Sequence, residues 1–401
     1  MDAQPKPAPT GAARTAAHVR KYLIAYTFLV AVVAVLFGYL LRSPVAANKR
    51  LLSDLVVVLA VITIYPSMVQ LKTEGLLKTF TQWRAILLSV VYVFALAPVL
   101  AYLFAHTLSP AAVGTGFFVA NVVPASSASL GYVLIAGGSI ELATALALIS
   151  FVASLGAIPL FLYLYLAGTH GSASVPMGSI VMSLVYVLVL PLVVGQITRL
   201  TLLRTKGKKF TDQTIKPHLS LATMLSMLAL IFTLVTLKAN LIVTKPDLVG
   251  RILLYQTIVI FGVLILSVFV SRLFKLSYQE HQAVAFISVT KNQSAAAAIA
   301  TSSLSPAAGL APATIPIIQP ILAVAYLHLE KVIARFLGGA SDEGTEVGAA
   351  NSPGIGPATS SAASGANGTE PAAPVVPLTP AAQTTAHTDQ SEASTTAQVE
   401  R

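Results

Sequence analysis

Ten apolar runs, each of about 20 residues, constrain this chain more than any other feature of its sequence. A helix of about that length crosses the roughly 30 Å hydrocarbon core of a bilayer. Of the 401 residues, 55% are hydrophobic and only 10% are charged, whereas soluble domains average about 25% charged residues. The sequence therefore predicts an all-α polytopic membrane protein. Its predicted transmembrane helices are residues 22–41, 52–70, 85–106, 111–137, 140–167, 177–200, 219–238, 250–273, 280–304 and 315–337.

The chain divides into three parts by composition. Residues 1–20 form a predicted cytoplasmic segment, and residues 21–338 form the ten-helix domain. Residues 339–401 are rich in Ala, Thr, Ser, Pro and Gly and carry almost no large apolar side chains. Such a segment buries too little surface to offset its chain entropy, so we expect a disordered cytoplasmic tail.

Basic residues predict the orientation, because lysine and arginine accumulate in cytoplasmic loops. With the N-terminus inside, 17 basic residues fall on the inner side and six, Lys238 among them, fall on the outer side. Both termini are therefore predicted to be cytoplasmic, in the cell membrane. The basic cluster of residues 199–216, which begins at Arg199, is interpreted as an inner loop held at the anionic leaflet and not as a nucleic-acid site.

Known catalytic signatures are missing from the sequence. There is no glycine loop that would cradle phosphate, no nucleophile elbow and no metal-ligand spacing. The chain has no cysteine, which excludes disulfides and thiolate metal sites. We therefore expect neither an enzyme nor a bound cofactor.

A shift of 167 residues indicates an internal repeat. It places Arg84 on Arg251, each near the start of a long apolar run, and it places Ser127 on Ser294. The same shift superimposes the fourth predicted span on the ninth. Since each half would have five spans, the second half must be inverted relative to the first, as in many secondary transporters. The two repeats would cover about residues 21–170 and 177–338.

The fourth and ninth spans are the two that contain interruptions. The fourth reads GTGFFVANVVPASSASLGYVLIAGG, and Pro124 is expected to break its helix near residues 122–125, because proline removes a backbone donor and clashes with the preceding turn. The ninth contains SVTKNQSAAAAIA at residues 288–300. Interrupted spans at corresponding positions of two halves indicate a transporter binding site.

The candidate binding residues come from these two interruptions, because a polar or ionisable group inside a membrane usually faces a protein interior or a water-filled cavity. Small residues after each break would let the two broken helices cross closely. The alternatives are that TKNQ is only a loop and that Lys291 extends its long stem to the membrane interface. The candidates are Asn121, Pro124, Ser126, Ser127, Ser129, Ser288, Thr290, Lys291, Asn292, Gln293 and Ser294.

Three stretches resemble the bile acid:sodium symporter family, whose superfamily includes arsenite-efflux carriers. NVVPASSASLGYVLIAGGSIELATALALIS (residues 121–150) is similar to the family's fourth and fifth helices, SVTKNQSAAAAIA to its ninth, and YPSMVQLKTEGLLKTF (residues 65–80) to its second. The resemblance implies ten helices in two inverted five-helix repeats. It also implies crossing broken helices 4 and 9, and alternating access.

The residues that the resemblance assigns to sodium are mostly changed. Sodium-coupled members have a carboxylate in the ninth helix and an asparagine after the small polar run of the fourth. Here Ser288 and Leu130 stand at those places, and Ala147 replaces a hydroxyl residue of the fifth helix. Ser129, Asn292 and Gln293 remain. The sodium ligand set is therefore incomplete, which argues against sodium coupling and leaves proton coupling open.

The sequence hypothesis is a secondary transporter of a small organic anion. Lys291 would supply a fixed positive charge or titrate during the cycle, aided by the positive N-termini of the second half-helices. Arsenite or antimonite efflux is the first alternative, which the lack of a cysteine disfavours. The second is a non-transporting receptor on the same scaffold. The expected partners are a small solute and the lipid bilayer, with a homo-oligomer left open.

Overall fold

The computed structural model describes residues 11–71, 79, 81–170 and 176–338. Most of these residues are helical, and the only β-type pairing among them is an isolated bridge. Eight helical segments of the described residues are long and apolar enough to cross a membrane. The fourth and ninth predicted spans are not among them, because each is divided into two shorter helices. The predicted tail at 339–401 lies outside the described residues.

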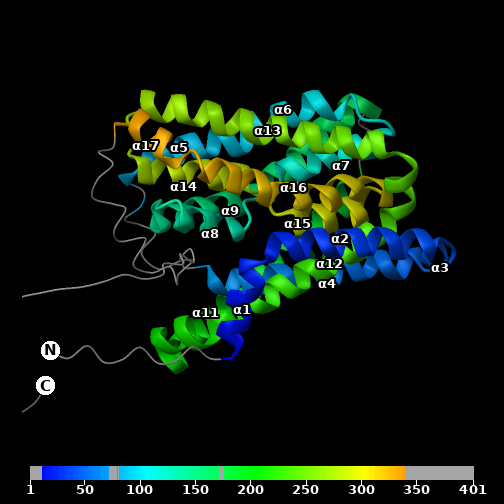
Figure 1. The fold of residues 1–401 in the computed structure, drawn as a ribbon, viewed down its shortest axis with the longest axis horizontal. Coiled ribbons are helices and arrows are strands. Elements are labelled where there is room, and N and C mark those ends of the chain that lie inside the picture. Colours follow the sequence, from blue (N-terminus) through cyan, green and yellow to red (C-terminus); the bar gives the residue numbers. More distant parts are fainter. Residues whose placement is uncertain (1–10, 72–78, 80, 171–175, 339–401) are drawn as a thin grey trace, which may run out of the picture. The chain divides into compact units, whose positions relative to one another are not determined.

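The first part of the chain contains the first three predicted spans, an N-terminal helix that precedes them and a short helix between the first two (Figure 1). In chain order they are α1 (Gly11–Lys21), α2 (Leu23–Leu40), α3 (Arg42–Ala47), α4 (Lys49–Gln70), α5 (Trp83–Val91), the π-helical turn η2 (Tyr92–Leu96) and α6 (Ala97–Ala105).

The next part of the chain contains the first broken span and the long helices that follow it. These elements are α7 (Ala111–Val122), α8 (Ala128–Ile135), α9 (Ile140–His170), α10 (Met177–Leu184), η4 (Val185–Val189), α11 (Leu190–Phe210), η5 (Thr211–Ile215), α12 (Lys216–Thr244) and α13 (Pro246–Leu273).

The last part contains the second broken span. Its elements are α14 (Tyr278–Val289), α15 (Gln293–Ile299), the π-helical turn η6 (Ala300–Leu304), the 3₁₀ turn η7 (Pro306–Gly309), α16 (Leu310–Leu327) and α17 (Glu330–Phe336). The first turn of α14 is fixed by a capping box in which the Ser277 hydroxyl accepts from the Glu280 amide and the Glu280 carboxylate accepts from the Ser277 amide. Glu280 is therefore part of the cap of α14.

Two apolar cores hold the helices together, and each broken span contributes one half to each core. The first core includes α4, α7, α12 and α15. The second includes α5, α8, α9 and α14. Helices α7 and α8, on either side of the first break, therefore pack into different cores, and so do α14 and α15 on either side of the second. The two breaks lie where the cores meet.

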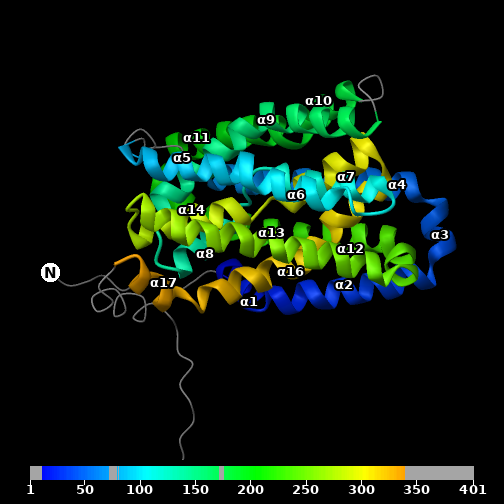
Figure 2. The ribbon, with the colours of Figure 1, turned by 90° about the horizontal axis from the view of Figure 1, so that it is seen from above.

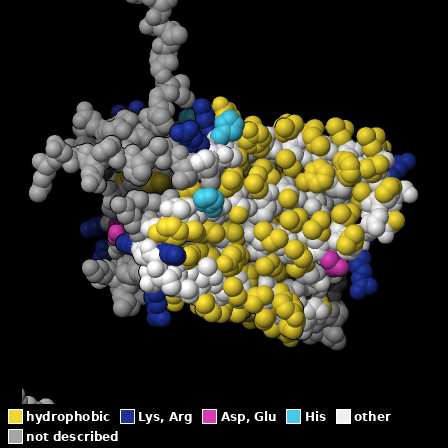
Figure 3. All heavy atoms as spheres, turned by 90° about the horizontal axis from the view of Figure 1, so that it is seen from below, with side chains coloured by type: hydrophobic (Ala, Val, Ile, Leu, Met, Phe, Trp, Pro, Cys, Tyr) yellow, Lys and Arg dark blue, Asp and Glu magenta, His cyan; other side chains and the backbone are white. Residues whose placement is uncertain are grey.

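Helix α12 packs against both α2 and α4, and α2 and α12 lie side by side in both views (Figures 1 and 2). Their close approach requires a small residue, because a Cβ on Gly38 of α2 would come within 2.4 Å of the Thr236 carbonyl oxygen on α12. On the face seen in Figure 3, hydrophobic side chains cover the middle, while lysine and arginine gather toward the ends. This distribution is the one expected of a surface in contact with lipid.

Two sequence interpretations change in the basic region of residues 199–216. The chain is helical there up to a kink at Gly207, whose φ of 78° is left-handed, so the expected loop is wrong. Arg199 is buried, and its guanidinium donates to the Val69 carbonyl at 3.2 Å. It therefore ties α11 to α4, and its placement at the leaflet surface was wrong because sequence spacing does not show this contact.

Two further differences concern single elements. The expected N-terminal segment contains α1, which packs against α12. Lys238, assigned to the outer loops, lies buried on α12 and donates to the Pro306 carbonyl. A lysine in the last turns of a helix can reach a loop carbonyl and need not enter the solvent.

Candidate functional site

The two helix breaks pair with each other. Ala125 and Lys291 form an antiparallel bridge. The Ser126 amide donates to the Thr290 carbonyl at 2.8 Å, and the Asn292 amide donates to the Pro124 carbonyl at 2.9 Å. Unpaired backbone groups are costly at membrane depth. Each break therefore supplies hydrogen-bond partners that the other has lost, and the two broken spans meet at this point.

Three neighbouring groups complete the backbone pairing at the breaks. The Ala125 amide donates to the Ser150 hydroxyl of α9 at 3.1 Å. The Gln319 side chain of α16 donates to the Lys291 carbonyl at 3.2 Å. Asn292 caps α15, because its side-chain oxygen accepts from the Ala295 amide at 3.2 Å. The paired breaks, which we call the crossing (residues 123–127 and 290–292), are thus held by α9 and α16.

Amide side chains connect the crossing to the surrounding helices. Gln293 donates to the Ala120 carbonyl at 3.1 Å and to the Gln319 side chain at 3.4 Å. One turn before the first break, Asn121 exchanges two hydrogen bonds with Gln256 of α13, at 3.0 and 3.1 Å. Both members of that pair are buried, so Asn121 joins α7 to α13 and is fully engaged with another side chain.

Lys291 is the one cation at the crossing. Its side chain is only 2% exposed, and its Nζ has no hydrogen-bond partner among the described residues. Two polar atoms of neighbouring residues, Thr290 Oγ1 and Gln293 Oε1, are likewise buried without a hydrogen-bond partner in the described part of the chain. The alternative in which Lys291 reaches the membrane interface is therefore wrong. Burying an ammonium group without an acceptor costs free energy. A ligand that supplied an acceptor would remove part of that cost.

The serine candidates mostly bond to nearby backbone. The Ser129 hydroxyl donates to the Ser126 carbonyl, and the Ser288 hydroxyl donates to the Val284 carbonyl at 2.7 Å. Ser127 is exposed and exchanges a hydrogen bond of 2.9 Å with Ser67 of α4. Ser294 is buried at the start of α15. Ser288 is thus turned toward its own helix at the position where the resemblance implies a carboxylate.

The structure brings together Pro124, Ser126, Thr290, Lys291 and Asn292 in the crossing itself. Ser127 is the last residue of the first break, and the other candidates flank the crossing on its four half-helices. Sequence reasoning missed two supporting residues, Ser150 and Gln256. Gln256 is a lone amide inside an apolar span, and the cost of burying a polar group, which pointed to Lys291, would have found it too.

Acidic groups do not form a cation site in the described part of the chain. No cluster of three or more His, Asp or Glu side chains that could hold a metal ion occurs among those residues. Glu280, the acidic residue of α14, is engaged in the helix cap. The charge at the crossing is therefore set by the Lys291 side chain.

Comparison with known proteins connects this architecture to a family. Residues 56–245 match the family model of the Sodium Bile acid symporter family. The matched range contains the first break and two of the three stretches that resemble that family, and it confirms the resemblance. Over these residues the chain is similar to the Sodium Bile acid symporter family. A search of the curated proteins found no match.

Family and structure together define the class of protein. The chain is a multi-pass membrane protein with apolar helices long enough to span a bilayer, and it matches a transporter family over residues 56–245. A small-molecule solute and membrane lipid are the partners that this class implies. The second break, at residues 290–292, lies outside the matched range, so its assignment rests on its pairing with the first.

Proposed function

We propose that this protein is a secondary transporter that moves a small organic anion across the membrane by alternating access, without sodium coupling. The observation that carries the proposal is the buried Lys291 ammonium, which has no acceptor among the described residues. A carboxylate or similar group on a solute would supply that acceptor as a charge-assisted hydrogen bond. Irregular backbone at membrane depth is typical of transporter binding sites.

The proposal includes ten spans arranged as two inverted five-helix repeats. Its support is the correspondence of the breaks: the shift of 167 residues that relates Arg84 to Arg251 carries the first break, 123–127, onto 290–294, which contains the second. The division of each broken span between two apolar cores supports alternating access. If the first core moved relative to the second, α7 and α15 would move in one direction and α8 and α14 in the other.

The electrostatics of the crossing support the absence of sodium coupling. Sodium prefers several oxygen ligands, as hard cations do. Ser288 brings no carboxylate, and its hydroxyl donates to the Val284 carbonyl of its own helix. The Asn292 side-chain oxygen is taken by the Ala295 amide. Lys291 places a positive charge beside these groups. A proton moving on and off Lys291 during the cycle is the coupling that we propose in place of sodium.

The remaining site candidates are proposed as the lining of the solute path. Ser127 ends the first break, and Asn121, Ser129 and Ser294 lie on the half-helices next to the crossing. Helices α8 and α15 both begin there, so their partly positive N-termini would favour an anionic solute. Part of this field at α15 is already used by the Asn292 cap, which leaves Lys291 as the main attraction.

A solute screen tests the proposal. The purified protein is heated with a panel of small carboxylates, each with and without sodium, and we expect one or more to raise the unfolding temperature equally in both conditions. Lys291→Gln should abolish the shift. Lys331→Gln, which changes an exposed lysine of α17, should keep it. A shift that requires sodium, or that survives in Lys291→Gln, would contradict the proposal, and no shift from any solute would favour the receptor alternative.

We also propose that the protein lies in the cell membrane with both termini in the cytoplasm. The absence of cysteine in the chain allows a clean test with single cysteines. Thr244→Cys changes an exposed residue where α12 meets α13, and Gln279→Cys changes an exposed residue at the start of α14. The two positions lie at opposite ends of α13. In intact cells an impermeant maleimide should label the first and not the second. The reverse labelling would overturn the orientation.

A further inference from the structure

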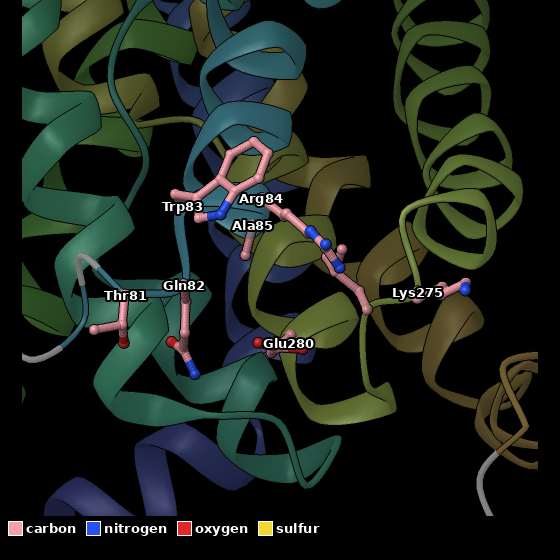
Figure 4. A pocket seen from close by; sticks show the side chains of 8 residues that line it. Thr81, Gln82, Trp83, Arg84, Ala85, Lys275 and Glu280 are labelled. Atoms are coloured by element: carbon pink, nitrogen blue, oxygen red, sulfur yellow. The ribbon is translucent and has the colours of Figure 1, made fainter.

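A cavity of about 240 Å³ lies between the start of α5 and the turn from α13 to α14 (Figure 4). None of its lining residues belongs to the crossing, so it is distinct from the proposed solute site. The residues that line it are Thr81, Gln82, Trp83, Arg84, Ala85, Lys275, Leu276 and Glu280.

The cavity lies at the membrane boundary. One candidate span begins at Trp83 and another ends at Leu273, and the cavity is formed where these two helix ends come together. Trp83 is 57% exposed, and Leu87, one helical turn further along α5, is 45% exposed. These two side chains share a face, and tryptophan is enriched at membrane–water interfaces. One rim of the cavity is therefore continuous with a surface suited to lipid.

The cavity is lined by two cations that form no ion pair with a described residue. The Arg84 guanidinium lies 5.7 Å from the centroid of the Trp83 ring, and Figure 4 shows its side chain extending from α5 toward the α13–α14 turn. Neither Arg84 nor Lys275 forms an ion pair within 4.0 Å among the residues that the structure describes. Lys275 has a φ of 56°, which is uncommon for a residue with a side chain and fixes it at the corner of the turn.

Glu280 does not neutralise these cations by an ion pair. One oxygen of its carboxylate accepts from both the amide and the hydroxyl of Ser277, each at 2.9 Å. That oxygen is thus engaged in the helix cap, at the cavity's edge. With Arg84 and Lys275 against the one carboxylate of Glu280, the lining keeps a net positive charge for an external anion.

We propose that this cavity binds the phosphate group of an anionic membrane lipid. The planar guanidinium of Arg84 matches two phosphate oxygens, and Lys275 adds a second positive charge. Trp83 and Leu87 pack against the part of the lipid that enters the hydrocarbon region. Basic pockets between helices near the inner surface suit such head groups. The site is independent of the solute and of the proposed transport cycle.

Thermal unfolding in nanodiscs tests this site. The unfolding temperature is measured with phosphatidylcholine alone and with added phosphatidylglycerol, and inorganic phosphate forms a third arm. We expect phosphatidylglycerol to raise the unfolding temperature, Arg84→Gln to remove at least half of that rise, and Lys275→Gln to remove a smaller part. Arg42→Gln is the matched control, because Arg42 lies 5.7 Å from the Tyr39 ring and is absent from the cavity lining.

Native mass spectrometry of the same variants gives a second readout, the number of phosphatidylglycerol molecules retained, which does not depend on stability. Fewer retained lipids in Arg84→Gln than in Arg42→Gln would support the site. Equal retention and equal temperature rises in these two variants would overturn it. A full rise produced by inorganic phosphate alone would overturn the assignment to lipid.

Discussion

Two buried lysines of this protein differ in whether a described residue accepts a hydrogen bond from the ammonium group. Lys238 of α12 is 5% exposed and donates to the Pro306 carbonyl, which joins α12 to the turn η7. Lys291 at the crossing is 2% exposed and has no hydrogen-bond partner among the described residues. Both ammonium groups are removed from water, yet among the described residues only that of Lys238 has an acceptor.

The difference separates a structural lysine from one that is suited to a ligand. Breaking a satisfied buried hydrogen bond leaves an orphaned partner and destabilises the fold. Removing an unsatisfied buried charge leaves nothing orphaned and lifts a cost. The comparison therefore predicts that Lys238 variants lose stability, while Lys291 variants lose function and keep their stability.

The largest effect is expected from Lys291→Met. Loss of a charge-assisted hydrogen bond to a solute costs about 2 kcal/mol, which is roughly a thirtyfold loss of uptake at low solute concentration. The unfolding temperature should be unchanged or higher. Uptake into proteoliposomes and thermal unfolding of the same preparation measure the two quantities. Unchanged uptake would place Lys291 with Lys238 as a structural residue.

Lys238→Met should show the opposite pattern. It removes the donor to Pro306 and leaves a buried carbonyl without its partner, which costs about 1–3 kcal/mol in the free energy of unfolding. Uptake per folded molecule should stay within about twofold of the unaltered protein. If this variant unfolded at the original temperature and lost uptake instead, the comparison would be reversed.

The Asn121–Gln256 pair tests whether satisfied polar groups elsewhere behave like Lys238. Asn121→Leu and Gln256→Leu each strand one buried amide and should each lower the free energy of unfolding by about 1–3 kcal/mol. The double variant strands neither amide, so its loss should be less than the sum. Strict additivity in the double-mutant cycle would show that the two side chains do not depend on each other.

Ser67→Ala should produce the smallest effect. Its hydroxyl exchanges a 2.9 Å hydrogen bond with the exposed Ser127, and water can replace such a partner. The loss should be about 0.5–1 kcal/mol in the free energy of unfolding. A loss as large as that of Lys238→Met would show that burial does not govern these costs.

Local sequence signals predicted the elements around the crossing well. Apolar length located the spans, and Pro124 located the first break, because both act through the backbone of the residues that carry them. The polar TKNQ stretch located the second break for the same reason. The ten-span inverted repeat stays a prediction, since eight unbroken helices of the described part meet the criteria for a span.

Contacts between distant residues were not predictable from the same signals. Arg199 reaches the Val69 carbonyl, 130 residues away, and Lys238 reaches Pro306, 68 residues away. Both were assigned to loops because charge alone was considered. The Ser150 hydroxyl, which accepts from the Ala125 amide, likewise has no local signature. Lys291 was identified because its cost in a membrane exists before any partner is known.

Sodium dependence of uptake tests the central claim most directly. Proteoliposomes containing the unaltered protein are loaded with potassium and diluted into sodium or potassium buffer with a labelled organic anion that stabilises the protein. The account predicts equal initial rates in the two buffers, and loss of uptake in both with Lys291→Met. Uptake that rises several-fold with an inward sodium gradient and persists in Lys291→Met would contradict it.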